Sequence, residues 1–205
     1  PFSCTRPASI HFSASLLEQS PARAIRFAIR SSLWFSSFMD KELTYMREAL
    51  EEAMMAACRD EVPIGAVLVD SKTGEIVARN GNRTIELSDP SAHAEMLCIR
   101  EGCQKAEAQR IPEFDLYVTL EPCAMCAAAI SFARIRRVII GAQDPKSGGV
   151  FHGAKFFEQA SCHHKPEAFS GVLEDECGGI LKTFFKAKRK AQKAAHKLEK
   201  ERATS

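Results

Sequence analysis

The stretch that decides the fold is DLYVTLEPCAMCAAAISFARIRRVIIGA, residues 115–142. It opens with the apolar and β-branched run DLYVTL and closes with RRVIIGA, and both runs are typical of buried strands. The residues between them, from Pro122 to about Ala133, are mostly small or apolar and predict a helix. A strand, a helix and a second strand in succession are expected to form a parallel pair of strands crossed by the helix.

The segments on either side extend this unit into a sheet with helices. Apolar residues at steps of three and four predict an amphipathic helix that contains Leu43, Met46, Leu50, Met54 and Ala57. The runs PIGAVLVD (63–70) and EIVARN (75–80), joined by the turn SKTG, predict an antiparallel hairpin. A second helix follows Ser91, and a last one starts near Glu174. The expected fold is α/β with three layers, α/β/α, in which helices cover both faces of a mixed sheet of about five strands.

The chain is long enough for one buried domain with an extension at each end, because 45% of its 205 residues are hydrophobic. We expect the domain at 39–190 and a basic tail at 191–205. Residues 1–38 hold nine Ser and five Phe without a sustained helical or strand period, so they are expected to lie outside the domain. Read-through or vector-derived sequence is favoured there over a targeting segment, with Met39 as the true start.

Positive charge is concentrated at the two ends of the chain. Residues 1–38 carry four Arg and one Glu, and residues 182–202 carry nine basic and two acidic side chains, whereas the middle has 15 basic and 23 acidic ones. Basic side chains beside the aromatic pair Phe184 and Phe185 favour contact with RNA phosphates and unpaired bases. The alternative is that the two rings anchor the last helix and the lysines form a solvated surface.

Location follows from what the sequence lacks. We find no apolar run approaching the roughly 20 residues that cross a bilayer, so no membrane span is expected. Eight cysteines occur without a recognisable signal peptide, which favours a reduced, cytoplasmic protein over an oxidised extracellular one. Most of the cysteines are then expected to be small apolar residues in or near the core.

Cys123 and Cys126 lie one helical turn apart at the expected start of a helix. Their thiolates can face one point in space, and the imidazole of His93, at the start of the preceding helix, is the obvious third ligand for a soft tetrahedral metal such as zinc. Helix starts at the carboxyl ends of parallel strands share one crevice, which brings these residues together. A redox pair, a disulfide and a structural zinc clip remain alternatives for the cysteine pair alone.

Glu95 gives this metal centre a chemical role. Three protein ligands leave a fourth position open, as in catalytic zinc sites, and Cys98 and Cys103 lie too far along the helix from His93 to close it. A carboxylate two positions from a ligand can reach water activated at that position and carry its proton, which is general acid and base geometry. H-x-E upstream of P-C-x-x-C is the signature of zinc nucleobase deaminases.

Three stretches, HAEM, LYVTLEPCAMCAAAISFARIRRVIIGAQDPKSGG and EDECGGILKTFFKAKRK, resemble the bacterial tRNA-specific adenosine deaminases of the zinc-dependent cytidine and deoxycytidylate deaminase superfamily. The similarity runs from about residue 43 to 189. It implies that residues 39–190 form a zinc deaminase domain with a cytidine-deaminase-like fold, that the protein is a homodimer, and that each subunit binds one Zn²⁺ through His93, Cys123 and Cys126. Glu95 matches the proton shuttle of the family.

The reaction that the resemblance implies is hydrolytic deamination of adenosine to inosine at the wobble position of a tRNA anticodon. Asn82 matches a position that hydrogen-bonds the base, and Asp144 and Lys146 match a loop that lies along the RNA. Ala94, between the ligand and the proton shuttle, is expected beside the substrate. The tail adds Phe185 and Arg189 as RNA contacts.

The metal chemistry alone does not choose the base. A free-base deaminase acting on guanine or cytosine is the alternative with the same zinc chemistry, and a non-catalytic zinc RNA-binding module is a more distant one. The stretch 150–164 matches the family only loosely, so the sequence assigns no outer RNA contacts there.

Overall fold

The computed structural model describes the backbone of residues 25–203 and the burial of residues 40–196 and 199–200. Its elements in chain order are α1 (Ile25–Cys58), β1 (Gly65–Asp70), β2 (Ile76–Gly81), α2 (Ala94–Lys105), β3 (Phe114–Leu120), α3 (Ala124–Phe132), β4 (Arg137–Ala142), the short 3-10 helix η1 (Phe156–Glu158), β5 (Glu167–Ser170) and α4 (Glu174–Ala203).

The five strands form one mixed sheet in the order β2-β1-β3-β4-β5. β1 pairs antiparallel with both β2 and β3, whereas β4 pairs parallel with both β3 and β5. The predicted hairpin and the predicted parallel pair crossed by a helix are therefore both present. The sequence did not predict β5, whose four residues alternate between exposed and partly buried at the edge of the sheet and so lack the apolar run of the other strands.

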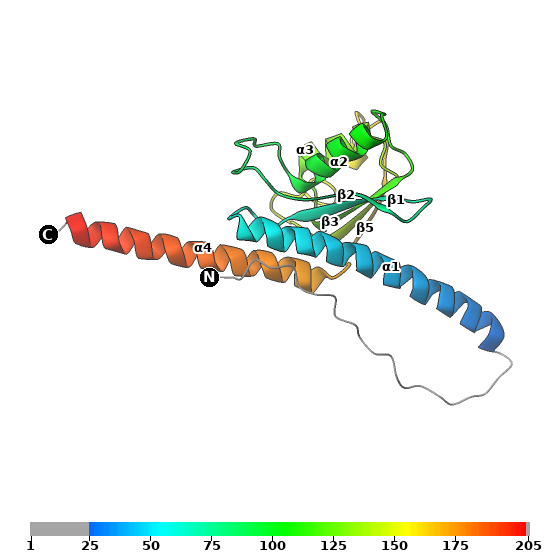
Figure 1. The fold of residues 1–205 in the computed structure, drawn as a ribbon, viewed down its shortest axis with the longest axis horizontal. Helices are drawn as coiled ribbons and strands as arrows, with labels where there is room; N and C mark the ends of the chain where they lie inside the picture. The colour runs from blue at the N-terminus through cyan, green and yellow to red at the C-terminus, as the bar shows by residue number, and fades with distance from the viewer. Residues whose placement is uncertain (1–24, 204–205) are drawn as a thin grey trace.

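Helices cover both faces of the sheet, which confirms the three-layer α/β/α prediction. Figure 1 shows α2 and α3 on one face and α1 and α4 on the other. Side chains alternate between the faces along each strand, so Leu116 and Val118 of β3 belong to the core under α2 and α3. Tyr117, between them, belongs to the core under α1 and α4.

α1 differs from its prediction in both its start and its buried face. It begins at Ile25 rather than near Leu43. Its buried face from residue 42 onward consists mainly of small residues, and Met54, predicted to be inward, is exposed; the buried set is Glu42, Met46, Ala49, Ala53 and Ala56. A Cβ at Gly65 of β1 would lie 2.0 Å from the Ala49 carbonyl oxygen, so the helix and the strand approach too closely for larger side chains.

The ends of the chain bear on the predicted domain boundaries. Residues 1–24 lie outside the described residues, and of residues 25–38 the structure describes only helical backbone. The extension at 1–38 therefore stays a prediction. At the other end, α4 continues as a helix through most of the predicted tail, and Figure 1 shows its second half extending beyond the sheet. Within the described part of the chain, no helix has the length and apolarity needed to cross a membrane.

Candidate active site

Two helix starts bring the predicted ligands together. His93 is the residue before α2 and Cys123 the residue before α3, and both have extended backbone conformations at the point where the chain enters its helix. Cys126 lies one turn into α3 and is buried. α3 directly follows β3, and α2 follows the loop after β2. His93 and Cys123, which are 30 positions apart, therefore meet at one edge of the sheet.

The three ligand atoms form a nearly equilateral triangle. His93 Nδ1 lies 3.7 Å from Cys123 Sγ and 3.5 Å from Cys126 Sγ, and the two sulfur atoms are 3.7 Å apart. Tetrahedral zinc with bonds of about 2.3 Å to sulfur and about 2.0–2.1 Å to nitrogen requires about 3.8 Å between sulfurs and about 3.6 Å between nitrogen and sulfur. The triangle therefore fits zinc bound by these three residues, with a fourth position left to a non-protein ligand.

The protonation of this group also suits a metal. The hydrogen bond between Cys123 and Cys126, together with His93, lowers the pKa of Cys123 to about 4. The hydrogen bond between the sulfurs, together with burial, raises the pKa of Cys126. Hydrogen bonding to Cys123 raises the pKa of His93. The thiolate is the form of cysteine that binds zinc, so a lowered pKa at Cys123 suits a metal ligand.

Glu95 lies in the first turn of α2, directly beside the triangle. Its side chain is only 3% exposed, and burial raises the pKa of its carboxyl group. Its Oε2 atom has no hydrogen-bond partner among the described residues. A buried carboxylate oxygen without a partner is costly unless a ligand or water satisfies it, so this atom is available to a ligand or water at the site.

Asn82 and Ala94, two predicted substrate residues, lie together beside the triangle. The Ala94 N–H donates a hydrogen bond of 2.9 Å to Asn82 Oδ1, and Asn82 is buried. Asn82 therefore satisfies one of the free N–H groups at the start of α2 from outside the helix. Because its oxygen is occupied in this way, its amide N–H groups are the part of the side chain left for a substrate.

The other four predicted substrate residues line one groove. Asp144 and Lys146 belong to the loop after β4, and Phe185 and Arg189 belong to α4 on the opposite wall. The groove has a volume of about 430 Å³ and also touches the ends of β3 and β4. Phe185 is 42% exposed, so its ring is available to a ligand. The sequence did not predict that these four residues line the same groove.

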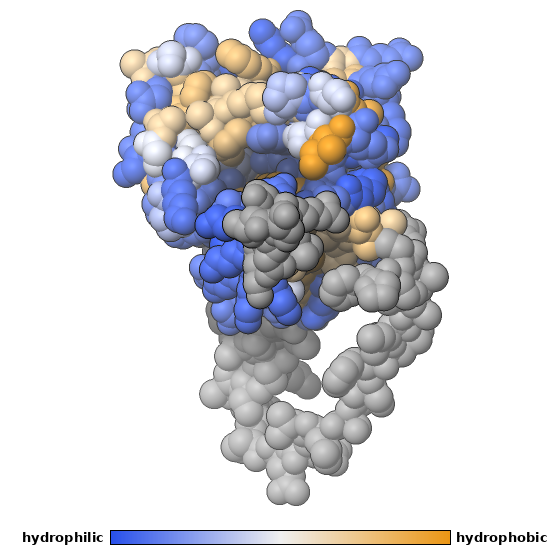
Figure 2. All heavy atoms as spheres, turned by 90° about the vertical axis from the view of Figure 1, so that its left-hand side faces the viewer, coloured by the Kyte–Doolittle hydropathy of each residue, from blue (hydrophilic) through white to orange (hydrophobic). Residues whose placement is uncertain are grey.

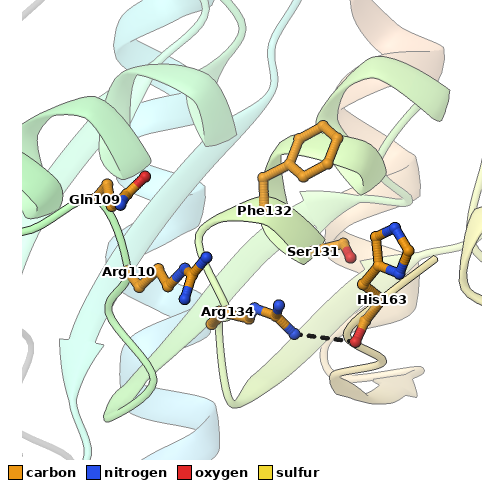
Figure 3. A pocket seen from close by; sticks show the side chains of 6 residues that line it. All are labelled: Gln109, Arg110, Ser131, Phe132, Arg134 and His163. Carbon is orange, nitrogen blue, oxygen red and sulfur yellow. Dashed lines mark hydrogen bonds between the residues drawn. The ribbon is translucent and has the colours of Figure 1, made fainter. Parts of the chain in front are cut away.

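A second hollow, of about 300 Å³, lies at the far end of α3 (Figure 3). It is lined by Gln109, Arg110, Ser131, Phe132, Arg134 and His163, and Arg134 Nη1 donates a 2.9 Å hydrogen bond to the His163 carbonyl oxygen. Ser131 lies five residues after Cys126 and eight after Cys123 along α3, so the hollow begins about 7–8 Å from the first of these positions and about 12 Å from the second. None of the six lining residues offers a thiolate or a carboxylate, and none was predicted for the site.

Glu121 is a buried acid that the sequence analysis missed. It stands between β3 and the ligand Cys123, and it accepts hydrogen bonds from the loop that contains Asp144 and His152. Burial alone would raise the pKa of Glu121, but the hydrogen bond from His152 and several backbone N–H groups lower it below its usual value. The available signal was a charged residue at the end of a buried strand, where an apolar residue is the norm.

Comparison with known proteins agrees with the geometry. The family model for the cytidine and deoxycytidylate deaminase zinc-binding region matches residues 39–142. A tRNA-specific adenosine deaminase of Agrobacterium fabrum is 56% identical over 151 residues, which are 74% of this chain and 98% of that protein.

One solved structure gives the same family, and a second gives the same fold. One, from a study of A-to-I editing by tRNA:A34 deaminases at the wobble position of transfer RNA, is 58% identical with a TM-score of 0.66 and covers 67% of this chain and 99% of its own. A guanine deaminase from Nitrosomonas europaea is 18% identical with a TM-score of 0.61, covering 69% of this chain and 83% of its own. At that identity the second likeness extends to the fold alone.

Proposed function

This chain belongs to the zinc-binding cytidine and deoxycytidylate deaminase family and, within it, to the tRNA-specific adenosine deaminases, and we propose that it converts adenosine to inosine at the wobble position of a tRNA anticodon. The chemistry is hydrolytic: adenosine and water give inosine and ammonia. The observation that carries the proposal is the zinc-sized triangle of His93, Cys123 and Cys126 with the partner-free oxygen of Glu95 beside it.

We assign one Zn²⁺ per subunit to His93, Cys123 and Cys126. When bound, zinc lowers the pKa of water from about 15.7 towards 7, so that a nucleophile is available at neutral pH. The protein's part is to hold the three ligands at the required distances on the starts of two helices. The extended conformations of His93 and Cys123 direct both side chains out of their helices and into the shared crevice.

Glu95 is assigned as the proton carrier. It takes a proton from the attacking water and gives it to the ring nitrogen beside the reacting carbon. It then takes the remaining proton from the new hydroxyl group and gives it to the amine, so that the C–N bond breaks, the carbonyl of inosine forms and ammonia leaves. Its burial keeps bulk water away from the carboxylate, and its partner-free Oε2 is not held by another group of the protein. Asn82 is assigned to hydrogen-bond the base through its amide N–H groups.

The groove between the loop after β4 and α4 is assigned to the RNA next to the reacting base. Phe185 offers a ring for stacking, and Lys146 and Arg189 offer positive charge for phosphates. This placement also explains why the basic end of the chain is attached to an otherwise acidic body. A free guanine would make no use of such a groove, which is why the RNA substrate is favoured over a free base.

The same proposal includes a homodimer working in the cytoplasm. Large apolar side chains are exposed on the loop before α2 and on α3, among them Ile85, Leu87, Met125 and Phe132. Figure 2, which looks onto the side where that loop lies, shows apolar residues gathered above a mainly hydrophilic region. Exposed apolar surface of this kind is typical of a protein interface. Light scattering of the purified protein should give twice the mass of one chain.

The deciding experiment uses an anticodon stem-loop with adenosine at the wobble position. Zinc-loaded protein should convert that adenosine to inosine, and a stem-loop with the adenosine moved to a stem position should not react. Free guanine is assayed in parallel for ammonia release. Ammonia from guanine with an unchanged stem-loop would support the free-base alternative instead, and the absence of both reactions would favour a non-catalytic zinc module.

A further inference from the structure

The loop between β4 and η1 is packed tightly against the segment that carries the first cysteine ligand. The N–H of Gly149 donates a 2.8 Å hydrogen bond to the carbonyl oxygen of Pro122. A Cβ at Gly149 would lie 2.5 Å from the nitrogen of Ala124, so only glycine allows this approach. The loop thus touches the start of α3 on one side and carries two groove residues on the other.

One carboxylate joins both ends of this loop. Glu121 Oε1 accepts hydrogen bonds from the N–H groups of Val150, Phe151 and His152 at 3.1, 2.8 and 2.9 Å. Its Oε2 accepts from the N–H of Asp144 at 3.0 Å and from His152 Nδ1 at 2.7 Å. The same oxygen is therefore bonded to the residue at the start of the loop and to the side chain near its end.

We propose that Glu121 and His152 are positioning residues, a latch that holds the loop at 144–152 in the shape that presents Asp144 and Lys146 to the RNA. The inference rests on the proposed function. Asp144 has its backbone N–H on Glu121 Oε2, and its own Oδ1 accepts from the N–H of Lys146 at 3.0 Å. A short chain of hydrogen bonds therefore runs from the latch to the groove without passing through the metal ligands.

His152 is the part of the latch that can be removed on its own. Loss of Glu121 would leave four backbone N–H groups without their acceptor, and the loop would not fold normally. Loss of the His152 ring removes only one bond and leaves the three N–H bonds to Oε1 and the Asp144 N–H bond to Oε2 in place. Loss of the His152 ring should therefore change the position of the loop and leave folding and zinc binding unchanged.

The test compares three variants of the zinc-loaded full chain with the unmodified protein. His152→Ala removes the bond. His152→Asn is the rescue variant, since the amide nitrogen of Asn takes about the place of Nδ1 and donates to the same carboxylate oxygen. His163→Ala is the matched control, an exposed imidazole in the same region with no part in the latch. kcat and KM for the stem-loop, zinc content, and hydrogen exchange of the backbone amides at 144 and 150–152 are measured for each.

We expect His152→Ala to raise KM about tenfold, with kcat changed less than about twofold and zinc content unchanged. The amides at 144 and 150–152 should exchange faster in that variant, while His152→Asn and His163→Ala should resemble the unmodified protein. An unchanged KM in His152→Ala would overturn the proposal. So would a loss of zinc or of kcat at constant KM, because the latch would then support the metal centre.

The hydrogen-exchange measurement keeps this inference separate from the proposed function. If the unmodified protein failed to convert the stem-loop, the proposed function would fail. Amide exchange needs neither RNA nor activity, so it would still report whether the ring holds the loop. Faster exchange in His152→Ala, reversed in His152→Asn, supports the latch, and identical exchange in all four proteins overturns it.

Discussion

Three side chains at the starts of α2 and α3 form the proposed metal centre, with Glu95 beside them. The four proposed RNA contacts among the residues that line the groove belong instead to the loop after β4 and to α4. The atoms of the metal centre are held at distances that a tetrahedral ion requires. The groove has no such constraint, because stacking and phosphate contacts tolerate shifts in position. In the proposed function, the reaction type is thus set by a few atoms at two helix starts, and the choice of substrate by a surface that tolerates shifts in position.

Removing a ligand should have the largest effect of any change in either region. Cys126→Ser replaces a buried sulfur by an oxygen that is a poorer zinc ligand, so bound zinc and activity should both fall below detection. Metal analysis and the stem-loop assay check this. Cys98→Ser is the matched control, because that buried cysteine donates to the Ala66 carbonyl oxygen and a serine hydroxyl can do the same. Normal zinc content in Cys126→Ser would contradict the assignment of this residue.

Glu95→Gln should come next and separates proton transfer from metal binding. The amide has the shape of the carboxylate but carries no proton between water and base, so kcat should fall about 10²–10⁴-fold while zinc content stays normal. Single-turnover kinetics with the stem-loop measure the chemical step directly. Wild-type turnover by this variant would mean that another group carries the proton.

Two substitutions of Asn82 separate its support of the start of α2 from its proposed contact with the base. Asn82→Ala loses the acceptor for the Ala94 N–H, which should cost about 1 kcal/mol and lower Tm by about 2–4 °C. Asn82→Asp keeps the acceptor, so its Tm should be normal. It loses the amide donor, and kcat/KM should fall at least about tenfold in both variants. Normal activity in Asn82→Asp would leave Asn82 with a structural role only.

The difference between the two regions also explains what the sequence could predict. The ligands, Glu95 and the strands around them follow from local spacing and periodicity in residues 115–142 and 93–95. The buried face of α1 was predicted only in part: Met46 is buried as expected and Met54 is not. Its buried alanines accompany the close approach of Gly65, which no helical pattern reveals. The pairing of Glu121 with His152 spans 31 positions, and His152 lies in the stretch 150–164 that matches the family only loosely, so only the folded chain shows it.

Arg189→Ala tests the groove and should have a smaller effect than any change at the metal centre. Loss of one phosphate contact should weaken stem-loop binding several-fold and reduce the slope of log K against log salt by about 0.7–0.9. kcat should be unchanged, because the residue touches no reacting atom. Fluorescence anisotropy over a salt series measures both quantities. Lys193→Ala, further along α4 and outside the groove lining, is the control. Equal slopes in the two variants would make Arg189 part of a solvated surface.

Deleting residues 1–38 should change least, because both regions are built from residues 82–189 and the family match begins at residue 39. The part of α1 that packs on the sheet, from Glu42 to Ala56, is retained. Glu42 also keeps its ion pair with Arg137 of β4, which ties this helix to the strand next to the groove. We therefore expect kcat/KM and zinc content within about twofold of the full chain, the range typical of changes outside a packed core. A deleted protein that lost zinc or failed to fold would show that residues before 39 support the sheet from the α1 side, and the metal centre would then depend on a third region.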